Sequence, residues 1–166
     1  MIENYKSAIA NQINASLQML GAAIQGCDEE RWHEPVAKMS FAQLAFHTLF
    51  YTDLYLGPNI DAMKAQAFHQ EYASSFGDYE ELANQPQTTR YERNFIDAYL
   101  SFVAEKAQQA IQRETPETLE QPADFPWLKM NRFELHPYNI RHINYHVGQF
   151  SLLGLQEKNQ SLAWVK

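Results

Sequence analysis

The sequence predicts an all-α protein, a four-helix bundle with a long crossover between the second and third helices. Three observations predict this fold. Four stretches repeat apolar residues every three or four positions, which is the period of an amphipathic helix. No stretch shows the persuasive alternation of polar and apolar residues that marks a half-buried strand. The chain has 166 residues, 45% of them hydrophobic, so a single domain over residues 1–166 has enough apolar side chains to form a core.

The first predicted helix spans residues 2–24. Its apolar side chains fall on one stripe at spacings of three or four, and they are Ile9, Ile13, Leu17, Leu20 and Ile24. Gly26 is the expected stop, because glycine is favoured just beyond a helix end.

The second predicted helix begins after Ser40 and ends at Leu56. Ser40 is a favoured N-cap, and Gln43, three residues later, completes the pattern of a capping box. Gly57 and Pro58 then end the helix. Apolar residues cover more than half of its circumference, which predicts burial on more than one side.

Residues 57–87 form the predicted crossover, because apolar periodicity is weak there and turn residues are frequent. A short helix fits residues 62–72. The residues that indicate loop are Ser74, Ser75, Gly77, Asn84, Gln85 and Pro86.

The third predicted helix begins at Thr88 or Thr89, with Glu92 as the capping-box partner of Thr89, and stops before Pro116. Its apolar side chains share one side of the helix, and they are Phe95, Ile96, Tyr99, Leu100, Val103, Ala107, Ala110 and Ile111.

Residues 115–134 are expected to be irregular, because three prolines recur there with Phe125 and Trp127 between them. The fourth predicted helix opens at Pro137, since proline is favoured at the first helical position, and continues to about Leu155.

Two histidines, His142 and His146, lie four residues apart in the fourth predicted helix. Four residues turn a helix by about 400° and advance it by about 6 Å, so both imidazoles project from one face and can reach one metal ion. The same line of the helix also carries Leu135, Tyr138, Asn139, Gln149 and Leu153. We therefore expect this face to point into the bundle.

His47 lies on an inward line of the second predicted helix. A lone histidine on an apolar face is more often a hydrogen-bonded core residue than a ligand. Burying three imidazoles without partners, however, would cost roughly 1–3 kcal/mol each, and one divalent cation satisfies all three. We therefore predict that His47, His142 and His146 are the ligands of one metal ion.

Three neutral imidazoles with an open position suit Zn²⁺, Ni²⁺, Co²⁺ or Fe²⁺, and the residues do not decide between these metals. Four further side chains lie one or two turns from the histidines and are candidates to support the ligands or contact a substrate: Gln43, Tyr138, Asn139 and Gln149. The alternative role for each is a cap or a hydrogen bond within the core.

The other histidines are not predicted to bind metal. His33 follows Glu30 at an ExxH spacing, but a di-iron bundle needs that spacing twice, with two further inward glutamates. His69 lies in the crossover, and His136 precedes Pro137, where helix capping is the simpler role.

Other catalytic templates are absent from the sequence. It contains no HExxH, GxSxG, GxGxxG or GxxxxGK[ST] pattern. The usual signatures of zincin proteases, serine hydrolases, Rossmann enzymes and P-loop NTPases are therefore missing. The single cysteine, Cys27, cannot form an intramolecular disulfide, and its acidic neighbours disfavour a reactive thiolate.

Charge and hydropathy limit the expected partners. There are 13 Lys and Arg against 20 Asp and Glu, for a net charge of −7, which disfavours nucleic acid as a partner. No window approaches the roughly 18 apolar residues of a membrane span, and there is no export signal. We expect a cytoplasmic protein that acts on a small molecule, with no nucleic-acid or membrane partner.

Two segments resemble the DinB-like and YfiT-like superfamily of metal-binding four-helix bundles. Residues 40–47 read Ser-Phe-Ala-Gln-Leu-Ala-Phe-His, and residues 142–150 read His-Ile-Asn-Tyr-His-Val-Gly-Gln-Phe. The resemblance covers nearly the whole chain, and the second segment is the more specific. It implies that a histidine of the second helix and the HxxxHxGQ segment supply the metal ligands, here His47, His142 and His146.

The resemblance further implies nickel or zinc as the favoured metal, with iron, cobalt or manganese as alternatives, an up-down-down-up helix order and a homodimer. Relatives of known activity include metal-dependent thiol transferases and a thiol-dependent maleylpyruvate isomerase, which implies a low-molecular-weight thiol as cosubstrate. Many relatives carry a charged residue between the two histidines of the fourth helix, whereas this chain has Ile143, Asn144 and Tyr145.

Three kinds of function stay open at this stage. In a metal-dependent enzyme, the cation would lower the pKa of a bound thiol or water, for transfer to a small electrophile or for hydrolysis. No general base is obvious, which favours the thiol route. In a binding protein, the metal would be structural and its coordination shell closed; Asp53, the nearest acidic residue in the second helix, lies well off the line of His47. The third alternative is a metal-free bundle.

Overall fold

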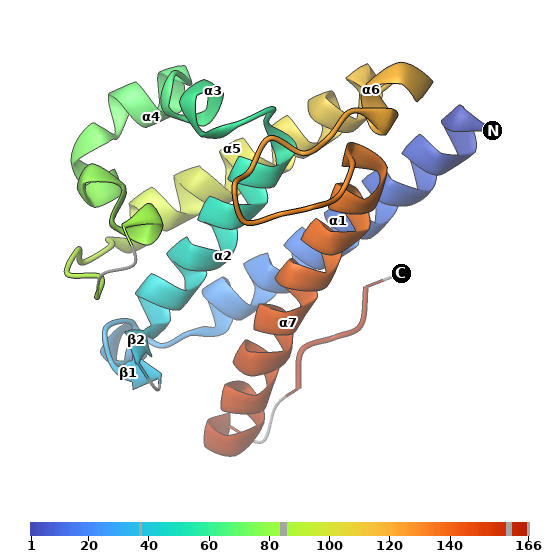
Figure 1. Ribbon diagram of the computed structural model, residues 1–166. Coiled ribbons are helices and arrows are strands. Elements are labelled where there is room, and N and C mark those ends of the chain that lie inside the picture. Colours follow the sequence, from blue (N-terminus) through green and yellow to red (C-terminus); the bar gives the residue numbers. More distant parts are fainter. Residues whose placement is uncertain (37, 84–85, 159–160, 166) are drawn as a thin grey trace.

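Four long helices dominate the computed structural model, which describes residues 1–36, 38–83, 86–158 and 161–165 (Figure 1). They are α1 (Ile2–Gly26), α2 (Phe41–Leu56), α5 (Arg93–Arg113) and α7 (Arg132–Lys158). Shorter elements fill the connections between them. The predicted all-α fold class is confirmed.

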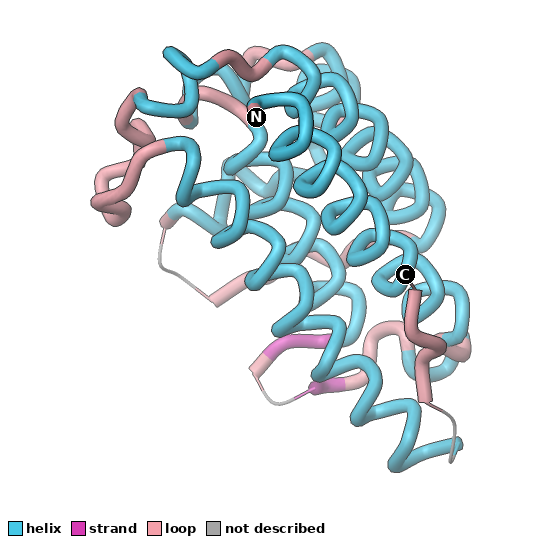
Figure 2. The backbone as a smooth tube through the Cα atoms, turned by 90° about the vertical axis from the view of Figure 1, so that its right-hand side faces the viewer, coloured by secondary structure: helices cyan, strands magenta, loops and turns pink. Residues whose placement is uncertain are grey.

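The long helices pack around one another in the order α1, α5, α2, α7. Helix α1 packs against α5 and α7, and α2 packs against the same two helices. Figure 1 shows α1 and α7 running toward the end where α1 leads into α2, while α2 and α5 run the opposite way. The tube in Figure 2 shows the long helices side by side along the molecule. Helices α2 and α7 are therefore neighbours although they are far apart in sequence.

The link from α1 to α2 contains the 3₁₀ turn η1 (Glu29–Arg31) and a short antiparallel hairpin. Strand β1 (Pro35–Val36) pairs with β2 (Met39–Ser40). Strands of two residues are too short to show an alternating pattern of polar and apolar residues in the sequence. The hydroxyl of Ser40 accepts a hydrogen bond from the backbone N–H of Gln43 (3.2 Å), and the Gln43 side chain accepts one from the N–H of Ser40 (2.9 Å). The predicted capping box is confirmed, and α2 ends at the predicted residue.

The crossover between α2 and α5 consists of three short elements. They are α3 (Ile60–Lys64), α4 (Ala67–Glu71) and the 3₁₀ segment η2 (Ala73–Leu82). The single helix predicted over residues 62–72 is therefore replaced by two shorter helices. Segment η2 covers the serines and Gly77 that the sequence assigns to loop, and Asn84 and Gln85 lie outside the described residues.

Three consecutive residues of η2 have left-handed backbone angles. Gly77, Asp78 and Tyr79 have φ of +50°, +50° and +63°. Only glycine adopts this region without steric cost, so a tight bend is built into the crossover. The bend determines where the side chains of residues 79–81 point.

Helix α5 begins later than the sequence predicts. Its N-cap is Glu92, and no side chain caps it. The backbone N–H groups of Thr88 and Thr89 instead donate to the carboxylate of Glu80, at 2.8 and 3.3 Å. The predicted start at these threonines is wrong, because their polar groups are used to hold the crossover in place.

Helix α7 begins earlier than the sequence predicts, at Arg132 instead of Pro137. Proline has no N–H to donate to the carbonyl four residues before it, here that of Phe133, and the hydroxyl of Tyr5 donates to that oxygen at 2.7 Å. Proline is thereby accommodated inside the helix. His136 consequently lies within α7, so the predicted capping role is wrong.

The segment that the sequence assigns to irregular structure contains one more helix. Thr115 caps α6 (Pro116–Glu120), and Pro116 occupies its first turn. An isolated bridge then pairs Pro122 with Asn131. Residues 132–134, at the end of the predicted irregular segment, already belong to α7, and the residues between α6 and α7 are otherwise irregular as predicted.

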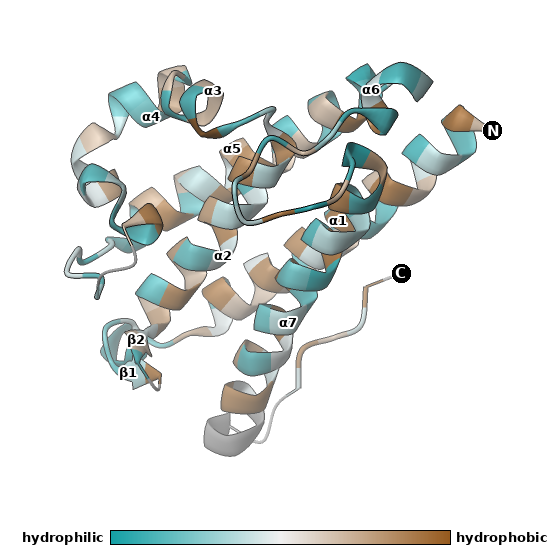
Figure 3. Ribbon diagram, in the orientation of Figure 1, coloured by the Kyte–Doolittle hydropathy of each residue, from teal (hydrophilic) through white to brown (hydrophobic). Residues whose placement is uncertain are grey.

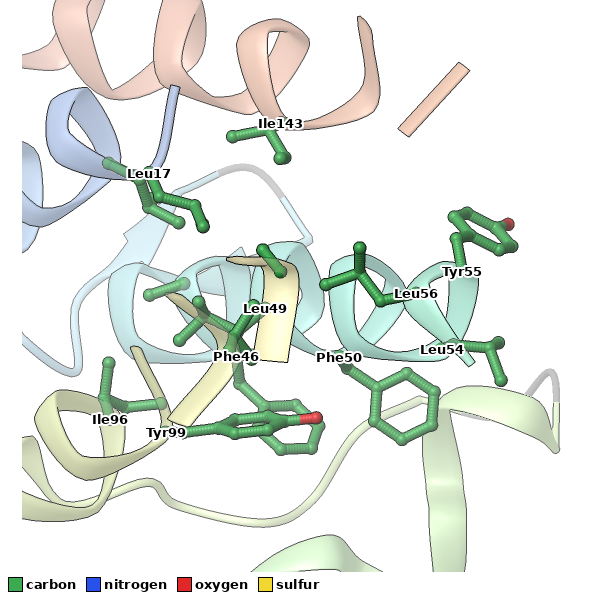
Figure 4. Packing of buried hydrophobic residues seen from close by; sticks show 14 of the residues in the cluster. Leu17, Phe46, Leu49, Phe50, Leu54, Tyr55, Leu56, Ile96, Tyr99 and Ile143 are labelled. Carbon is green, nitrogen blue, oxygen red and sulfur yellow. The ribbon is translucent and has the colours of Figure 1, made fainter. Parts of the chain in front are cut away.

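The core lies between the four long helices, and α2 runs through its centre. Thirteen of the 16 residues of α2 are buried, which confirms the predicted burial on more than one side. Figure 4 shows Phe46 and Phe50 of α2 near Tyr99 of α5, and Phe46 stacks on Tyr91 with ring centroids 4.0 Å apart. Helices α1, α5 and α7 each carry both hydrophilic and hydrophobic residues, as expected of amphipathic helices (Figure 3).

Over the part of the chain that the structure describes, no helix is long and apolar enough to cross a membrane.

Candidate metal centre

The three predicted ligand histidines lie together between α2 and α7. One nitrogen from each of His47, His142 and His146 lies within 4.8 Å of the others. Their ring centroids are 5.5 Å apart for His47 and His142, 4.9 Å for His47 and His146, and 4.7 Å for His142 and His146. A tetrahedral zinc site, with metal–nitrogen bonds of about 2.0–2.1 Å, would hold its nitrogens roughly 3.3 Å apart. Small side-chain rotations would therefore bring the three rings onto one ion.

Burial keeps two of these imidazoles neutral. It lowers the pKa of His142 to about 3, with further lowering by the nearby charges of His146 and His47. It also lowers the pKa of His146 to about 4; the hydrogen bond to Gln149 opposes this shift and His47 reinforces it. Both rings are thus neutral near pH 7, and a neutral imidazole has the lone pair that a metal ion needs.

Hydrogen bonds orient two of the three rings. The Nδ1 of His47 lies 3.0 Å from Oε2 of Glu81, and the Nδ1 of His146 lies 2.7 Å from Oε1 of Gln149. Both partner atoms are acceptors, so each Nδ1 is the protonated donor, and in the neutral form of either ring the lone pair is on Nε2. This is the tautomer required for ligation through Nε2.

Several buried polar atoms around the histidines lack partners among the described residues. They are Nδ1 of His142, Oδ1 of Asn139 and Oε1 of Glu81. A buried polar atom without a partner is costly, and a cation with its bound water would offer these atoms partners. The residues present therefore fit a metal ion.

The four supporting candidates have different surroundings. Gln149 hydrogen-bonds a histidine of the cluster, as described above. Asn139 donates to the backbone oxygen of Thr52 at 3.1 Å, which ties α7 to α2. Gln43 donates to the backbone oxygens of Gln87 and Thr89, and so supports the crossover, not a histidine.

Tyr138, the fourth candidate, belongs to an aromatic wall beside the cluster. Its ring lies 5.5 Å from that of Tyr55, and the rings of Tyr51 and Tyr55 lie 5.7 and 6.4 Å from His142. Trp127, which is 46% exposed, donates from Nε1 to the Tyr55 hydroxyl at 3.2 Å. The wall thus presents an apolar surface next to His142.

The hydroxyls of Tyr51 and Tyr55 in this wall are protonated at neutral pH. Burial raises the pKa of Tyr51 to about 12, and the charges of Glu81 and Tyr138 add to the shift. Burial likewise raises the pKa of Tyr55. Both side chains are therefore hydrogen-bond donors and not bases.

The remaining histidines have other partners. His69 is buried and lies 2.7 Å from Oδ2 of Asp53, while His136 is buried 3.0 Å from Oε1 of Glu114. His33 lies in the link between α1 and α2. Within the described residues, none of the three joins the metal-type cluster.

Tyr51, Tyr55 and Glu81 are residues of this centre that are not predicted from the sequence. Glu81 is the least predictable of them. It lies in the crossover, where no helical spacing relates it to His47. Its only sequence signal is the acidic pair with Glu80, and such pairs are common on protein surfaces.

Three histidines from two neighbouring helices of a helical bundle thus meet in an arrangement that could hold one metal ion. No fourth histidine, cysteine or carboxylate joins the cluster among the described residues. A family model of the DinB superfamily matches residues 12–150, and the chain belongs to this superfamily. No curated protein and no solved structure matches it.

Proposed function

We propose that the protein is a metal-dependent enzyme in which His47, His142 and His146 hold one divalent cation, and that it activates a thiol for transfer to a small electrophilic substrate. The observation that carries this proposal is the meeting of three histidine nitrogens within 4.8 Å. Nickel or zinc is the proposed metal, and iron, cobalt and manganese are the alternatives. Activation of water, for hydrolysis, is the second route at the same site.

When bound, the cation would act as a Lewis acid that lowers the pKa of a thiol or water so that a nucleophile is available near pH 7. The chain itself supplies the other requirements. Gln149 and Glu81 fix the tautomers of two ligand rings, and the wall of Tyr51, Tyr55 and Tyr138 shields one side from water. The tyrosine hydroxyls can donate hydrogen bonds to a polar group of the substrate.

The thiol route is supported by two considerations. The DinB-like resemblance includes thiol transferases, and a low-molecular-weight thiol is accordingly the proposed cosubstrate. The polar groups of α7 that face the site are amides and a tyrosine, not carboxylates, and the carboxylate of Glu81 is hydrogen-bonded to a ligand histidine, so no free carboxylate is at hand to act as a general base. We also propose that the enzyme works in the cytoplasm as a homodimer, without a nucleic-acid or membrane partner.

Metal content tests the ligand assignment. Untagged wild-type protein is expected to retain close to one equivalent of divalent metal in elemental analysis after dialysis, and His142→Ala is expected to lose most of it, because two histidines bind far more weakly than three. His33→Ala, at a histidine outside the cluster, is the matched control and should retain the wild-type content. Equal metal in wild type and His142→Ala would refute the assignment.

A turnover screen tests the catalytic proposal. Metal-loaded protein is expected to consume a thiol together with a small electrophile, and His142→Ala is expected to lose this activity. Ester or amide cleavage without thiol consumption would favour hydrolysis. Metal binding without turnover of any combination would favour a non-catalytic metal- or ligand-binding protein with a structural metal.

A further inference from the structure

Glu81 is a buried carboxylate that the crossover places against a histidine of the cluster. Its Oε2 lies 3.0 Å from Nδ1 of His47, and its side chain is only 5% exposed. The backbone oxygen of Glu81 accepts a hydrogen bond from the hydroxyl of Tyr51 at 3.3 Å. Tyr51 and His47 both belong to α2, so side chain and backbone of Glu81 dock on the same helix.

The charge of this carboxylate has no cationic side chain to compensate it among the described residues. Oε2 pairs with the imidazole of His47, and the second oxygen, Oε1, is buried with no hydrogen-bond partner in the described part of the chain. A buried negative charge is costly unless a positive charge lies nearby. A divalent cation bound to Nε2 of His47 would supply that charge, and Glu81 would interact with it through the Nδ1–H of the ring.

The neighbours of Glu81 hold the segment in place from both sides. The Tyr79 hydroxyl lies 3.1 Å from Nδ1 of His69, whose Nε2 lies 2.7 Å from Asp53 of α2. Glu80 points the other way and binds Thr88, with 2.7 Å between its Oε1 and the threonine hydroxyl. The left-handed bend at residues 77–79 makes the side chains of Tyr79 and Glu80 point to different partners. Glu81 is therefore held against α2 by a fixed backbone and not by a loose loop.

We propose that Glu81 is a positioning residue of the metal centre. It holds the His47 ring with Nε2 turned toward the other two histidines, and its charge increases the affinity of the site for a divalent cation. This inference rests on the proposed function, because it presupposes that His47 is a ligand.

Metal affinity of the full-length protein tests the inference. Zinc affinity would be measured by competition with a chromophoric chelator, and the visible spectrum of the Co²⁺ form would report ligand geometry. Glu81→Ala is expected to weaken zinc binding 10- to 100-fold and to alter the Co²⁺ spectrum, in line with the usual effect of removing a carboxylate that supports a metal-bound histidine. Glu81→Gln, which keeps the size and an acceptor oxygen but removes the charge, should weaken binding by an intermediate factor.

Asp78→Asn is the matched control. It removes one negative charge from the same segment at an exposed position with φ of +50°, and asparagine tolerates this backbone region well. Its zinc affinity and Co²⁺ spectrum should equal those of the wild type. An equal loss in Asp78→Asn would show a general effect of surface charge and would overturn the proposal.

The outcomes separate this inference from the proposed function. If the wild type binds no divalent metal, the metal centre itself is refuted. If the wild type binds and both Glu81 variants bind within twofold of it, only the role of Glu81 is refuted. Circular dichroism of the metal-free variants checks folding, and should Glu81→Ala not fold, the near-isosteric Glu81→Gln decides.

Discussion

Two buried carboxylates away from the histidine cluster each collect donors from distant elements. The carboxylate of Asp53 on α2 accepts hydrogen bonds from Gln66, His69, Tyr99 and Lys106. Burial would raise its pKa, but the hydrogen bond from His69 and the charge of Lys106 lower it below its usual value. Asp53 thus joins the crossover and α5 to α2 through one charged group.

Removing the Asp53 carboxylate should therefore be strongly destabilising. Asp53→Ala removes the carboxylate from the buried His69 and from the amine of Lys106, which keeps only its bond to the backbone oxygen of residue 53, and breaking a buried ion pair in this way costs about 3–5 kcal/mol. Urea denaturation would measure the free energy of unfolding. Glu105→Ala, at an exposed carboxylate on α5, is the control and should change it by less than about 0.5 kcal/mol. A loss below 1 kcal/mol in Asp53→Ala would contradict this account.

Glu114 makes stability depend on acid pH. Burial would raise its pKa, but hydrogen bonds from His136, Arg132 and Thr118 outweigh burial and lower the pKa to about 2, against an ordinary value of 4.5. Because the folded pKa is depressed, the stabilisation is fully present above pH 4.5 and is lost as the pH falls toward 2. We expect this group to contribute about 1–2 kcal/mol to that loss after allowance for solvent screening.

Unfolding measured between pH 5 and 2.5 would check this contribution. Glu114→Gln cannot ionise at this position, so its free energy of unfolding should fall less steeply over that range than that of the wild type. Parallel pH profiles for the two proteins would show that Glu114 does not contribute to the acid sensitivity.

At the level of elements, a helix end is predicted correctly where the residues that determine it are close to it in the sequence. Both ends of α2 are correctly predicted because Ser40, Gln43 and Gly57 are local stop and start signals. The starts of α5 and α7 are wrong because distant residues decide them: Glu80 holds Thr88 and Thr89, and Tyr5 compensates for the missing N–H of Pro137. No pattern within one helix contains that information.

The bend of the crossover gives a prediction at the same scale. A Cβ at Gly77 would lie 2.5 Å from the hydroxyl oxygen of Thr89, in a backbone region that other residues avoid. Gly77→Ala should reduce the free energy of unfolding by about 1–3 kcal/mol. Gly148→Ala in α7, where a Cβ meets no atom within 4 Å, should instead raise it by up to about 1 kcal/mol. Equal effects of the two substitutions in chemical denaturation would refute the steric argument.

At the level of the whole molecule, the histidine cluster joins two helices that only the complete bundle brings together. The pairing of His142 with His146 follows from helical spacing, and the inward direction of His47 follows from its apolar neighbours. The sequence therefore predicts which three histidines approach one another. It could not predict Glu81 or Trp127, because their positions depend on how the crossover and the segment before α7 fold over α2. In the aromatic wall, Tyr138 is among the predicted candidates. Tyr51 and Tyr55 are not, although they follow His47 on α2 by about one and two turns.

Metal binding across α2 and α7 should stabilise the entire fold. A ligand that binds only the folded state at a free concentration 100 times its dissociation constant raises the free energy of unfolding by about 2.7 kcal/mol. We expect this increase for Zn²⁺ with the wild type in urea denaturation, and a much smaller one for His47→Ala at the same zinc concentration. An equal increase in both proteins would place the bound zinc elsewhere.

The separation of the ligands along the chain has a kinetic consequence. His142 and His146 are brought together as soon as α7 coils, whereas His47 is 95 residues away from His142, and that loop must close first. A nascent or partly unfolded chain in which only α7 has formed would therefore bind a cation weakly, through two imidazoles. Binding of one cation by all three histidines would require α2 and α7 to have packed against each other, so tight metal binding would report a chain in which these two helices are already joined.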